Sequence, residues 1–421
     1  MQNFNQFISH LSQLISFKSV LGEKAPNAPF GKEVGNCLDW FLSLANEFGF
    51  QTINYDGYAG EVYYGEGEEV GIIGHLDVVP VGIGWDSDPF TLTERDGVYY
   101  GRGVCDDKTP LLSCLYALKE LKDSEIKVNK KFRLIVGCNE ESGWQDIEYL
   151  KTKTTLPEYG FSPDGDFPVC YAEKGIVEVE FNIPKLIGFE CIKGGTALNA
   201  VCDLAKAKPL GKIDEKELKQ FNLGFDGDYI VSKGKAAHGS TPHLGINAML
   251  KLFEYFLYKG ENVKNVLDNL FYDKKGVFKL ENEQGTVTLS PNLICENEKG
   301  IAITCDLRIP APFELKDVTP IFDSMQIPYK TKLRHPPMMA EKDGEFVKTL
   351  LNAYNEITGD KAQPISMGGS TFARAFSKGS AFGPKLKGHV DNIHDANENV
   401  SKGQILTAYQ IYKKSIFDLA K

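Results

Sequence analysis

The sequence predicts an α/β protein: a domain built on a mixed sheet with helices on both faces, and an α+β domain inserted into it. Three observations carry this expectation. Strand, helix and strand patterns follow one another within 70–137, alternating strand patterns begin near Ile176, and helices with glycine-rich loops return after Pro337. The length of 421 residues fits two or three domains. We expect one domain at 1–175 with 337–421, and the inserted domain at 176–336.

The first domain is expected to open with two helices. Phe7, Leu11, Leu14 and Ile15 recur at helical spacing, as do the apolar residues of 38–48.

Two buried strands and a helix are expected next. The runs 70–74 and 132–137 are short, apolar and closed by glycine, which is typical of buried strands in an α/β sheet. Between them, leucines over 111–121 predict an amphipathic helix, and Pro110 suits its first turn. Helical crossovers between neighbouring strands therefore build this sheet.

The inserted domain shows a different pattern. Residues 176–181 alternate between apolar and polar, and 301–308 form a second such run, as in antiparallel strands with one exposed face. A helix is expected over 246–257. The last motif of the chain, at 388–398, lies beyond the inserted domain, so we expect both flanks of the insertion to join one sheet.

Composition excludes several classes of protein. Lys and Arg number 47 against 57 Asp and Glu, and the net charge of −10 argues against nucleic acid or an anionic membrane as the main partner. The nine cysteines are odd in number with no C-x-x-C spacing, which argues against a disulfide framework or a cysteine zinc site. Residues 1–20 do not resemble a signal peptide, and no apolar run approaches the roughly 18–20 residues of a membrane span. We expect a cytoplasmic protein.

Acids and histidines gather in five short motifs. Several of these motifs follow predicted strands, where α/β sheets place their sites. Two histidines with several carboxylates form a ligand set suited to a pair of divalent ions. The candidate residues are His75 with Asp77, Asp106, Glu140 with Glu141, Asp164, and His394.

Each motif also has a structural interpretation. His75 and Asp77, at positions i and i+2 of a strand, would share a face, with the Asp77 carboxylate accepting from the imidazole, and such a pair can simply belong to a core. Glu140 and Glu141 can form a solvated loop, and Asp164 sits in a Pro-Asp-Gly sequence typical of turns.

The ordered set of motifs resembles the co-catalytic zinc peptidases, the family of aminoacylase, carboxypeptidase G and the bacterial dipeptidases. The resemblance covers nearly the whole chain. Within the family, the chain is most similar to peptidase V type or Xaa-His type dipeptidases, through the segment 84–90, the long middle domain and the segment 368–374. The implied activity is hydrolysis of dipeptides with a free C-terminal carboxylate.

The resemblance also implies a cofactor and its ligands. Two divalent ions are expected, with zinc favoured and manganese or cobalt as alternatives. His75 and Asp164 would hold one ion, Glu141 and His394 the other, and Asp106 would bridge both. In addition, Asp77 would orient His75, and Glu140 would be the general base.

Substrate contacts are implied for the inserted domain, which corresponds to the family's lid. His238 would donate to the oxyanion, and Arg308 would bind the substrate carboxylate as a planar fork. Asn199 would lie near the substrate. The backbone of Gly368, Gly369, Ser370 and Thr371 would offer N–H groups to the same carboxylate.

Alternatives remain at this point. An N-acyl or N-succinyl amino acid deacylase would use the same metal centre, and a peptide-binding protein without activity would have lost the base or a ligand. A monomer is favoured over a homodimer because the middle domain is long.

Cys105 is interpreted as a buried spectator beside Asp106 rather than a ligand. Structural roles are expected for the remaining histidines, His10, His243, His335 and His389.

Overall fold

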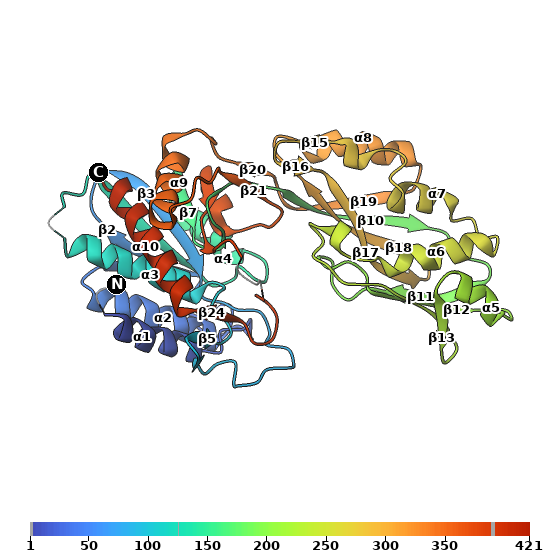
Figure 1. The fold of residues 1–421 in the computed structure, drawn as a ribbon, viewed down its shortest axis with the longest axis horizontal. Coiled ribbons are helices and arrows are strands. Elements are labelled where there is room, and N and C mark those ends of the chain that lie inside the picture. Colours follow the sequence, from blue (N-terminus) through green and yellow to red (C-terminus); the bar gives the residue numbers. More distant parts are fainter. Residues whose placement is uncertain (1–2, 125, 389–391) are drawn as a thin grey trace. The chain divides into compact units, whose positions relative to one another are not determined.

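The computed structural model describes residues 3–124, 126–388 and 392–421, and its chain divides into two compact units. The first unit comprises Met1–Tyr171, Met339–Ile365 and Thr371–Lys421. The second comprises Ala172–Met338 with Ser366–Ser370. The first unit is therefore discontinuous in sequence, and its C-terminal segments return to it after the second unit (Figure 1).

A nine-stranded mixed sheet forms the framework of the first unit. β3 runs parallel to β6 and β7, and β22 runs parallel to β7, whereas the β1–β2, β2–β6 and β9–β22 pairs are antiparallel. Because β22 comes from the C-terminal segment, both flanks of the insertion join one sheet, as expected. In spatial order the strands are β1 (Gln51–Tyr55), β2 (Ala59–Tyr64), β6 (Lys130–Gly137), β3 (Glu68–His75), β7 (Tyr159–Ser162), β22 (Lys378–Ala381), β9 (Cys170–Glu173) and β20 (Met338–Met339), with β21 (Ile365–Met367) paired to β9.

Helices cover both faces of this sheet, which confirms the predicted fold class. On one face, Ile73 of β3 packs with Ile147 of α4 (Gln145–Lys153) and Phe372 of η4 (Phe372–Ala375). On the other face, Gly74 abuts Leu111 of α3 (Lys108–Lys122), which lies beside α10 (Lys402–Leu419) (Figure 1). The remaining long helices of this unit are α1 (Phe4–Ser16) against α3, α2 (Lys32–Glu47) against β1 and β2, and α9 (Glu345–Thr358) against α10.

An eight-stranded antiparallel sheet forms the second unit. Its apolar face packs against α6 (Ala248–Tyr258) and α8 (Leu315–Met325) in one core. The expected helix starts at Ala248 rather than 246, because the Asn247 side chain accepts from the N–H of Met249 and caps it. In spatial order the strands are β13 (Leu223–Asp226), β14 (Tyr229–Lys233), β12 (Leu204–Pro209), β11 (Phe189–Gly194), β17 (Thr288–Asn297), β18 (Gly300–Ile309), β10 (Gly175–Ile183) and β19 (Tyr329–His335).

Short elements complete the described chain: β8 (Gly165–Asp166) pairs with β23 (Pro384–Lys385), and β15 (Glu281–Asn282) with β16 (Gly285–Thr286). The short helices are α5 (Glu215–Gln220), α7 (Lys264–Val266), η1 (Pro242–Leu244), η2 (Leu267–Phe271) and η3 (Val277–Lys279).

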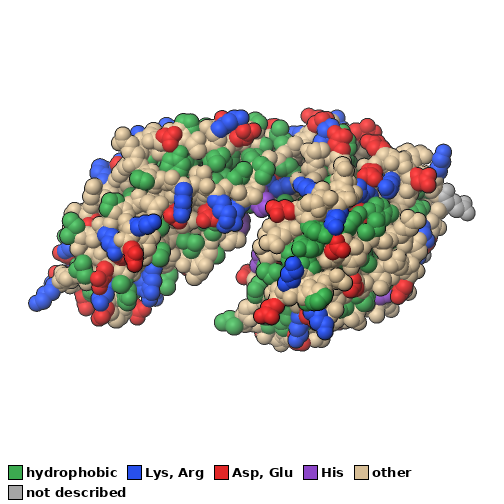
Figure 2. Space-filling view, turned by 180° about the vertical axis from the view of Figure 1, so that it is seen from behind, with side chains coloured by type: hydrophobic (Ala, Val, Ile, Leu, Met, Phe, Trp, Pro, Cys, Tyr) green, Lys and Arg blue, Asp and Glu red, His purple; other side chains and the backbone are tan. Residues whose placement is uncertain are grey.

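Among the helices of the described residues, none combines the length and apolar character that a membrane span requires. Positive and negative side chains are interspersed on the face seen in Figure 2, as the modest net charge suggests.

Candidate metal centre

The candidate ligands of the first unit lie where three parallel strands end. His75 is the last residue of β3, Glu140 and Glu141 follow β6, and Asp164 follows β7. Since these strands are parallel neighbours, their carboxyl ends meet at one edge of the sheet. The topology therefore brings together side chains that are far apart in sequence.

A small antiparallel sheet brings the C-terminal motif to the same place. β24 (Asn399–Ser401) pairs with β5 (Val98–Tyr100), which also pairs with β4 (Thr93–Arg95). Asp106 lies in the loop after β5, and His394 lies in the loop before β24. This pairing therefore carries the two loops to each other.

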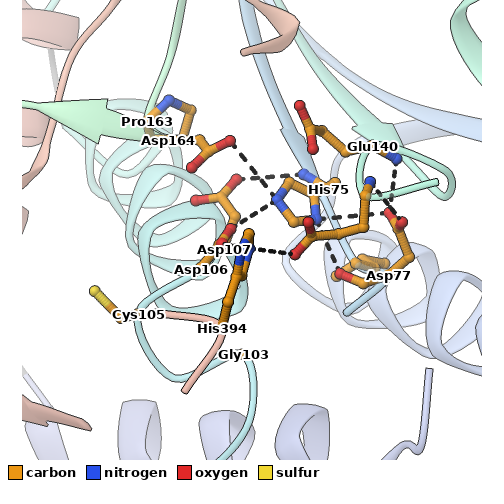
Figure 3. Close-up of polar contacts among 12 residues, drawn as sticks. His75, Asp77, Gly103, Cys105, Asp106, Asp107, Glu140, Pro163, Asp164 and His394 are labelled. Atoms are coloured by element: carbon orange, nitrogen blue, oxygen red, sulfur yellow. Dashed lines mark hydrogen bonds and ion pairs between the residues drawn. The ribbon is translucent and has the colours of Figure 1, made fainter. Parts of the chain in front are cut away.

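Asp106 lies between two histidines (Figure 3). Its Oδ1 is 3.0 Å from Nε2 of His75, and its Oδ2 is 3.0 Å from Nε2 of His394. Asp164 Oδ2 lies 3.7 Å from Nε2 of His75, and Glu141 Oε1 lies 3.2 Å from Nε2 of His394. Two groups of donor atoms thus share the Asp106 carboxylate.

The donor set fits divalent cations. One possible ligand atom from each of His75, Glu140 and Asp164 lies within 4.8 Å of the others, and the same holds for His75, Asp106 and Glu141. Imidazole nitrogens with carboxylate oxygens suit zinc and similar ions. Burial raises the pKa of Glu140 well above its usual value and that of Asp164 to about 7, and nearby acids add to both effects. Positive charge at this place would relieve the repulsion among the acids.

The same acids also raise the pKa values of the two histidines. Burial alone would lower the pKa of His75, but its hydrogen bonds and charge pairing with Asp106 and Asp77 raise it well above the usual value. In His394, Asp106 and Glu141 likewise outweigh burial and raise the pKa to about 11. A metal ion would use the same imidazole lone pairs, so protons and metal ions would compete for them.

Asp77 lies elsewhere than the strand pattern predicts. β3 ends at His75, so Asp77 lies beyond the strand, and the shared-face argument does not apply. His75 Nδ1 donates to the backbone carbonyl oxygen of Asp77 at 2.9 Å, whereas the carboxylate Oδ1 is 3.5 Å away. The carboxylate instead accepts from the backbone N–H groups of Glu140 and Glu141, both at 3.1 Å.

Two buried acids around this centre, Asp107 and Glu398, have no role assigned from the sequence, although Glu398 is expected near the proposed ions. Asp107 accepts from the backbone N–H of His75 at 3.2 Å, and a Cβ on Gly74 would come within 2.2 Å of the same carboxylate, so a larger residue at position 74 would displace Asp107. Glu398 accepts from the backbone of the loop that carries Asp106. The available signals were the Asp-Asp pair and the acid that closes the last motif. Cys105 directs its sulfur away from the carboxylates (Figure 3).

The second unit groups the candidate substrate residues among themselves. Asn199 meets the His238 loop, because its carbonyl oxygen accepts from the N–H of Gly239 at 2.7 Å. His238 Nδ1 lies 2.6 Å from the hydroxyl oxygen of Ser240.

Arg308 is buried in β18, and three hydrogen bonds hold its guanidinium group. Its Nε and Nη2 donate to the two oxygens of Asp306, at 2.8 and 2.9 Å, and its Nη1 donates to the carbonyl oxygen of Gly368 at 2.9 Å. Gly369 and Ser370 follow Gly368 in the second unit. Thr371 lies in the first unit, where its hydroxyl caps η4. No role beside Arg308 is assigned to Asp306 from the sequence. His389, for which a structural role is expected, lies outside the described residues.

Peptidase family M20/M25/M40 matches residues 71–418 of this chain. The chain belongs to this family. It is 33% identical to a Bacillus subtilis (strain 168) protein named "Putative dipeptidase YtjP", covering 98% of this chain and 97% of that protein. A Staphylococcus epidermidis protein named "Putative dipeptidase" is also 33% identical, with coverage of 99% and 97%.

Solved structures show the same fold at low sequence identity. Human carnosine dipeptidase 1 has a TM-score of 0.61 at 13% identity, covering 99% of this chain and 96% of that one. The di-peptidase Dug1p of Saccharomyces cerevisiae has a TM-score of 0.58 at 15% identity, with coverage of 99% and 96%. The family and its relatives confirm the resemblance seen in the sequence: this M20 chain is a metallopeptidase, a metal-dependent hydrolase of peptide bonds.

Proposed function

We propose that the protein is a dipeptidase that uses two divalent ions and requires a free carboxylate at the C-terminus of its substrate. The observation that carries the proposal is the position of Asp106, whose two oxygens each lie 3.0 Å from Nε2 of a different histidine, His75 or His394. A carboxylate in this position suits a ligand that two ions share. The dipeptidase names of the relatives support the same substrate class.

The same distances support the ligand assignment that the family resemblance implies. His75 and Asp164 would hold one ion, Glu141 and His394 the other, and Asp106 would contact both. Zinc is the first candidate because it accepts imidazole and carboxylate together, and manganese or cobalt could use the same ligands.

Glu140 is the proposed general base. Two bound ions would supply positive charge that acidifies water and polarises the scissile carbonyl. Glu140 would take a proton from the attacking water and return it to the leaving amine. Its surroundings support this role, because desolvation raises the pKa of its carboxyl and makes the group a better proton acceptor.

The second unit would supply the substrate contacts. His238 would donate to the developing oxyanion, with Asn199 beside it. Arg308 would bind the substrate carboxylate together with the backbone N–H groups of residues 368–371. Its guanidinium plane is already fixed by Asp306, which lowers the entropy lost on binding.

We further propose a cytoplasmic monomer that acts on small peptides. The nine cysteines, all among the described residues, form no disulfide, and this usage suits a reducing compartment.

The test combines metal analysis with a substrate panel. Purified protein is loaded with zinc, manganese or cobalt, its bound metal is counted, and turnover is measured on dipeptides, N-acetyl amino acids and N-succinyl amino acids. We expect two ions per chain and the highest kcat/KM with dipeptides. Preference for the acylated amino acids would instead establish a deacylase with the same metal centre. One ion per chain, or none, would contradict the shared role of Asp106.

A further inference from the structure

The buried carboxylate of Glu398 anchors the loop that carries Asp106. Its Oε1 accepts from the backbone N–H groups of Cys105 and Asp106, at 2.8 and 3.2 Å. Its Oε2 accepts from the N–H of Gly103 at 3.1 Å and from Nη1 of Arg102 at 2.8 Å. Both oxygens thus have two donors each, and the backbone of Asp106 cannot shift without breaking this arrangement.

Arg102 connects the same carboxylate to the loop of His394. Its Nη2 donates to the carbonyl oxygen of His394 at 3.3 Å, and its guanidinium lies over the ring of Trp85 at 5.3 Å. Arg102 and Glu398 are each only 1% exposed. The buried Arg102–Glu398 ion pair therefore contacts both the loop of Asp106 and the loop of His394, which bring proposed ligands to the centre from outside the main sheet.

We propose that the Arg102–Glu398 pair is a positioning device that fixes Asp106 relative to His394, and so sets the affinity for the ion between His394 and Glu141. This inference rests on the proposed two-ion site. Buried ion pairs give little net stability compared with apolar packing, so stability alone does not explain the pair. Its hydrogen bonds end on the backbone of two proposed ligands, which is how outer residues tune a metal site.

The two ion positions should depend on this pair unequally. His75 closes β3, and Asp164 lies between β7 and β8, so the main sheet holds the first position. His394 lies in a loop that the Arg102–Glu398 pair secures, so the second position relies on it. Loss of the pair should weaken the second ion far more than the first.

The main test is metal titration of the Glu398→Gln variant. In this variant, an amide NH2 replaces one oxygen and faces donors, so two of the four hydrogen bonds are lost. Metal-free protein is titrated with Co2+, followed by visible absorption, and with Zn2+ against a chromophoric chelator. We expect the first equivalent to bind as in the wild type and the second about 10–100-fold more weakly. An unchanged second equivalent would overturn the inference.

Glu61→Gln is the matched control. It disrupts another buried glutamate–arginine pair of the first unit, in which Glu61 and Arg133 are 0% and 3% exposed. We expect a lower midpoint of thermal unfolding with both metal equivalents retained. If this control lost the second equivalent equally, the effect would be general loosening, and the inference would fail.

A second variant covers the case in which Glu398→Gln does not fold. Arg102→Lys keeps the charge, but one ammonium cannot reach both Glu398 and the carbonyl oxygen of His394 in the geometry of a guanidinium. The same selective loss of the second equivalent is expected, and normal binding of both equivalents would overturn the inference. The titration of the wild type tests the proposed function separately: fewer than two bound ions would refute the two-ion site itself. The variants test only whether the Arg102–Glu398 pair sets the affinity of the second ion.

Discussion

The side chain of Asp77 accepts a hydrogen bond from the backbone N–H of Glu140 at 3.1 Å. Its other oxygen accepts from the N–H of Glu141, also at 3.1 Å, while its carbonyl oxygen accepts from His75. One residue thus orients a proposed ligand on β3 and the acid pair that follows β6. Because the carbonyl can only accept, Nδ1 of His75 carries the proton, which leaves Nε2 to face Asp106 and Asp164.

Asp77→Asn should therefore disturb both sides of the centre. The amide offers one acceptor oxygen, and its NH2 would oppose a backbone N–H donor at Glu140 or Glu141. We expect metal affinity or activity to fall by about 10–100-fold. Isothermal titration with Zn2+ and steady-state kinetics measure the two effects. Asp56→Asn, at an acid with 60% side-chain exposure in the same unit, should change neither. Wild-type values for Asp77→Asn would refute this orienting role.

Glu140 and Glu141 should differ in what their glutamine variants lose. If Glu140 is the base, Glu140→Gln should lower kcat by about 10²–10⁴-fold while two ions stay bound. If Glu141 is a ligand, Glu141→Gln should lower the affinity for one ion as well as the activity. Parallel measurement of kcat and metal content separates the roles. Loss of an ion in Glu140→Gln would make it a ligand, since one of its oxygens lies within reach of His75 and Asp164.

The sequence predicts much of the fold because its signals are local. Apolar spacing identifies α1, α2, α3 and α6, and the alternation in 176–181 identifies β10. The end of β3 at His75, however, is set by how the chain leaves the sheet, and the strand pattern alone extends it to Asp77.

The partners within the centre depend on distant residues. Strand ends predict that acids and histidines gather, but they do not predict that Glu398 binds the backbone of Cys105. Nor does the pattern around Arg308 indicate that Asp306 holds its guanidinium. Such contacts arise from loops that tertiary packing brings together, so one sequence gives no periodic signal for them.

Metal removal should destabilise the first unit. A ligand that binds only the folded state stabilises it by about 2.7 kcal/mol at a hundredfold excess over Kd. Without cations, the acids around Asp106 repel one another, and the neighbouring histidines offset this only in part. We expect EDTA to lower the midpoint of thermal unfolding and Zn2+, Mn2+ or Co2+ to restore it. An identical midpoint before and after chelation would contradict the candidate centre.

Carboxylate recognition can be tested with a substrate and its amide. If Arg308 binds the substrate carboxylate, a dipeptide should have a higher kcat/KM than its C-terminal amide, by about 10–100-fold for a charge-assisted hydrogen bond. Arg308→Lys should reduce this ratio, because lysine cannot pair with Asp306, Gly368 and the substrate at once. The amide is the internal control, since its own kcat/KM should change little. Equal turnover of acid and amide by the wild type would remove this role.

The buried carboxyl of Asp146 should make stability depend on pH. Asp146 is 0% exposed in the first turn of α4, and its oxygens accept from the N–H groups of Cys138, Asn139 and Ile147. Burial and the charge of Asp77 nevertheless raise its pKa to about 7, above the unfolded value of about 4. The folded state therefore binds this proton more tightly, so the stabilisation is full below pH 4 and is lost as pH rises through 7.

Asp146→Asn removes this dependence, because asparagine does not titrate. The free energy of unfolding of the wild type minus that of Asp146→Asn should fall by up to about 4 kcal/mol between pH 4 and pH 8. Urea denaturation in EDTA at both pH values measures it, and titrations common to both proteins cancel in the difference. The hydrogen bond that asparagine cannot replace adds an offset that does not vary with pH. A difference that is the same at both pH values would mean that the three N–H donors keep Asp146 ionised in spite of its burial.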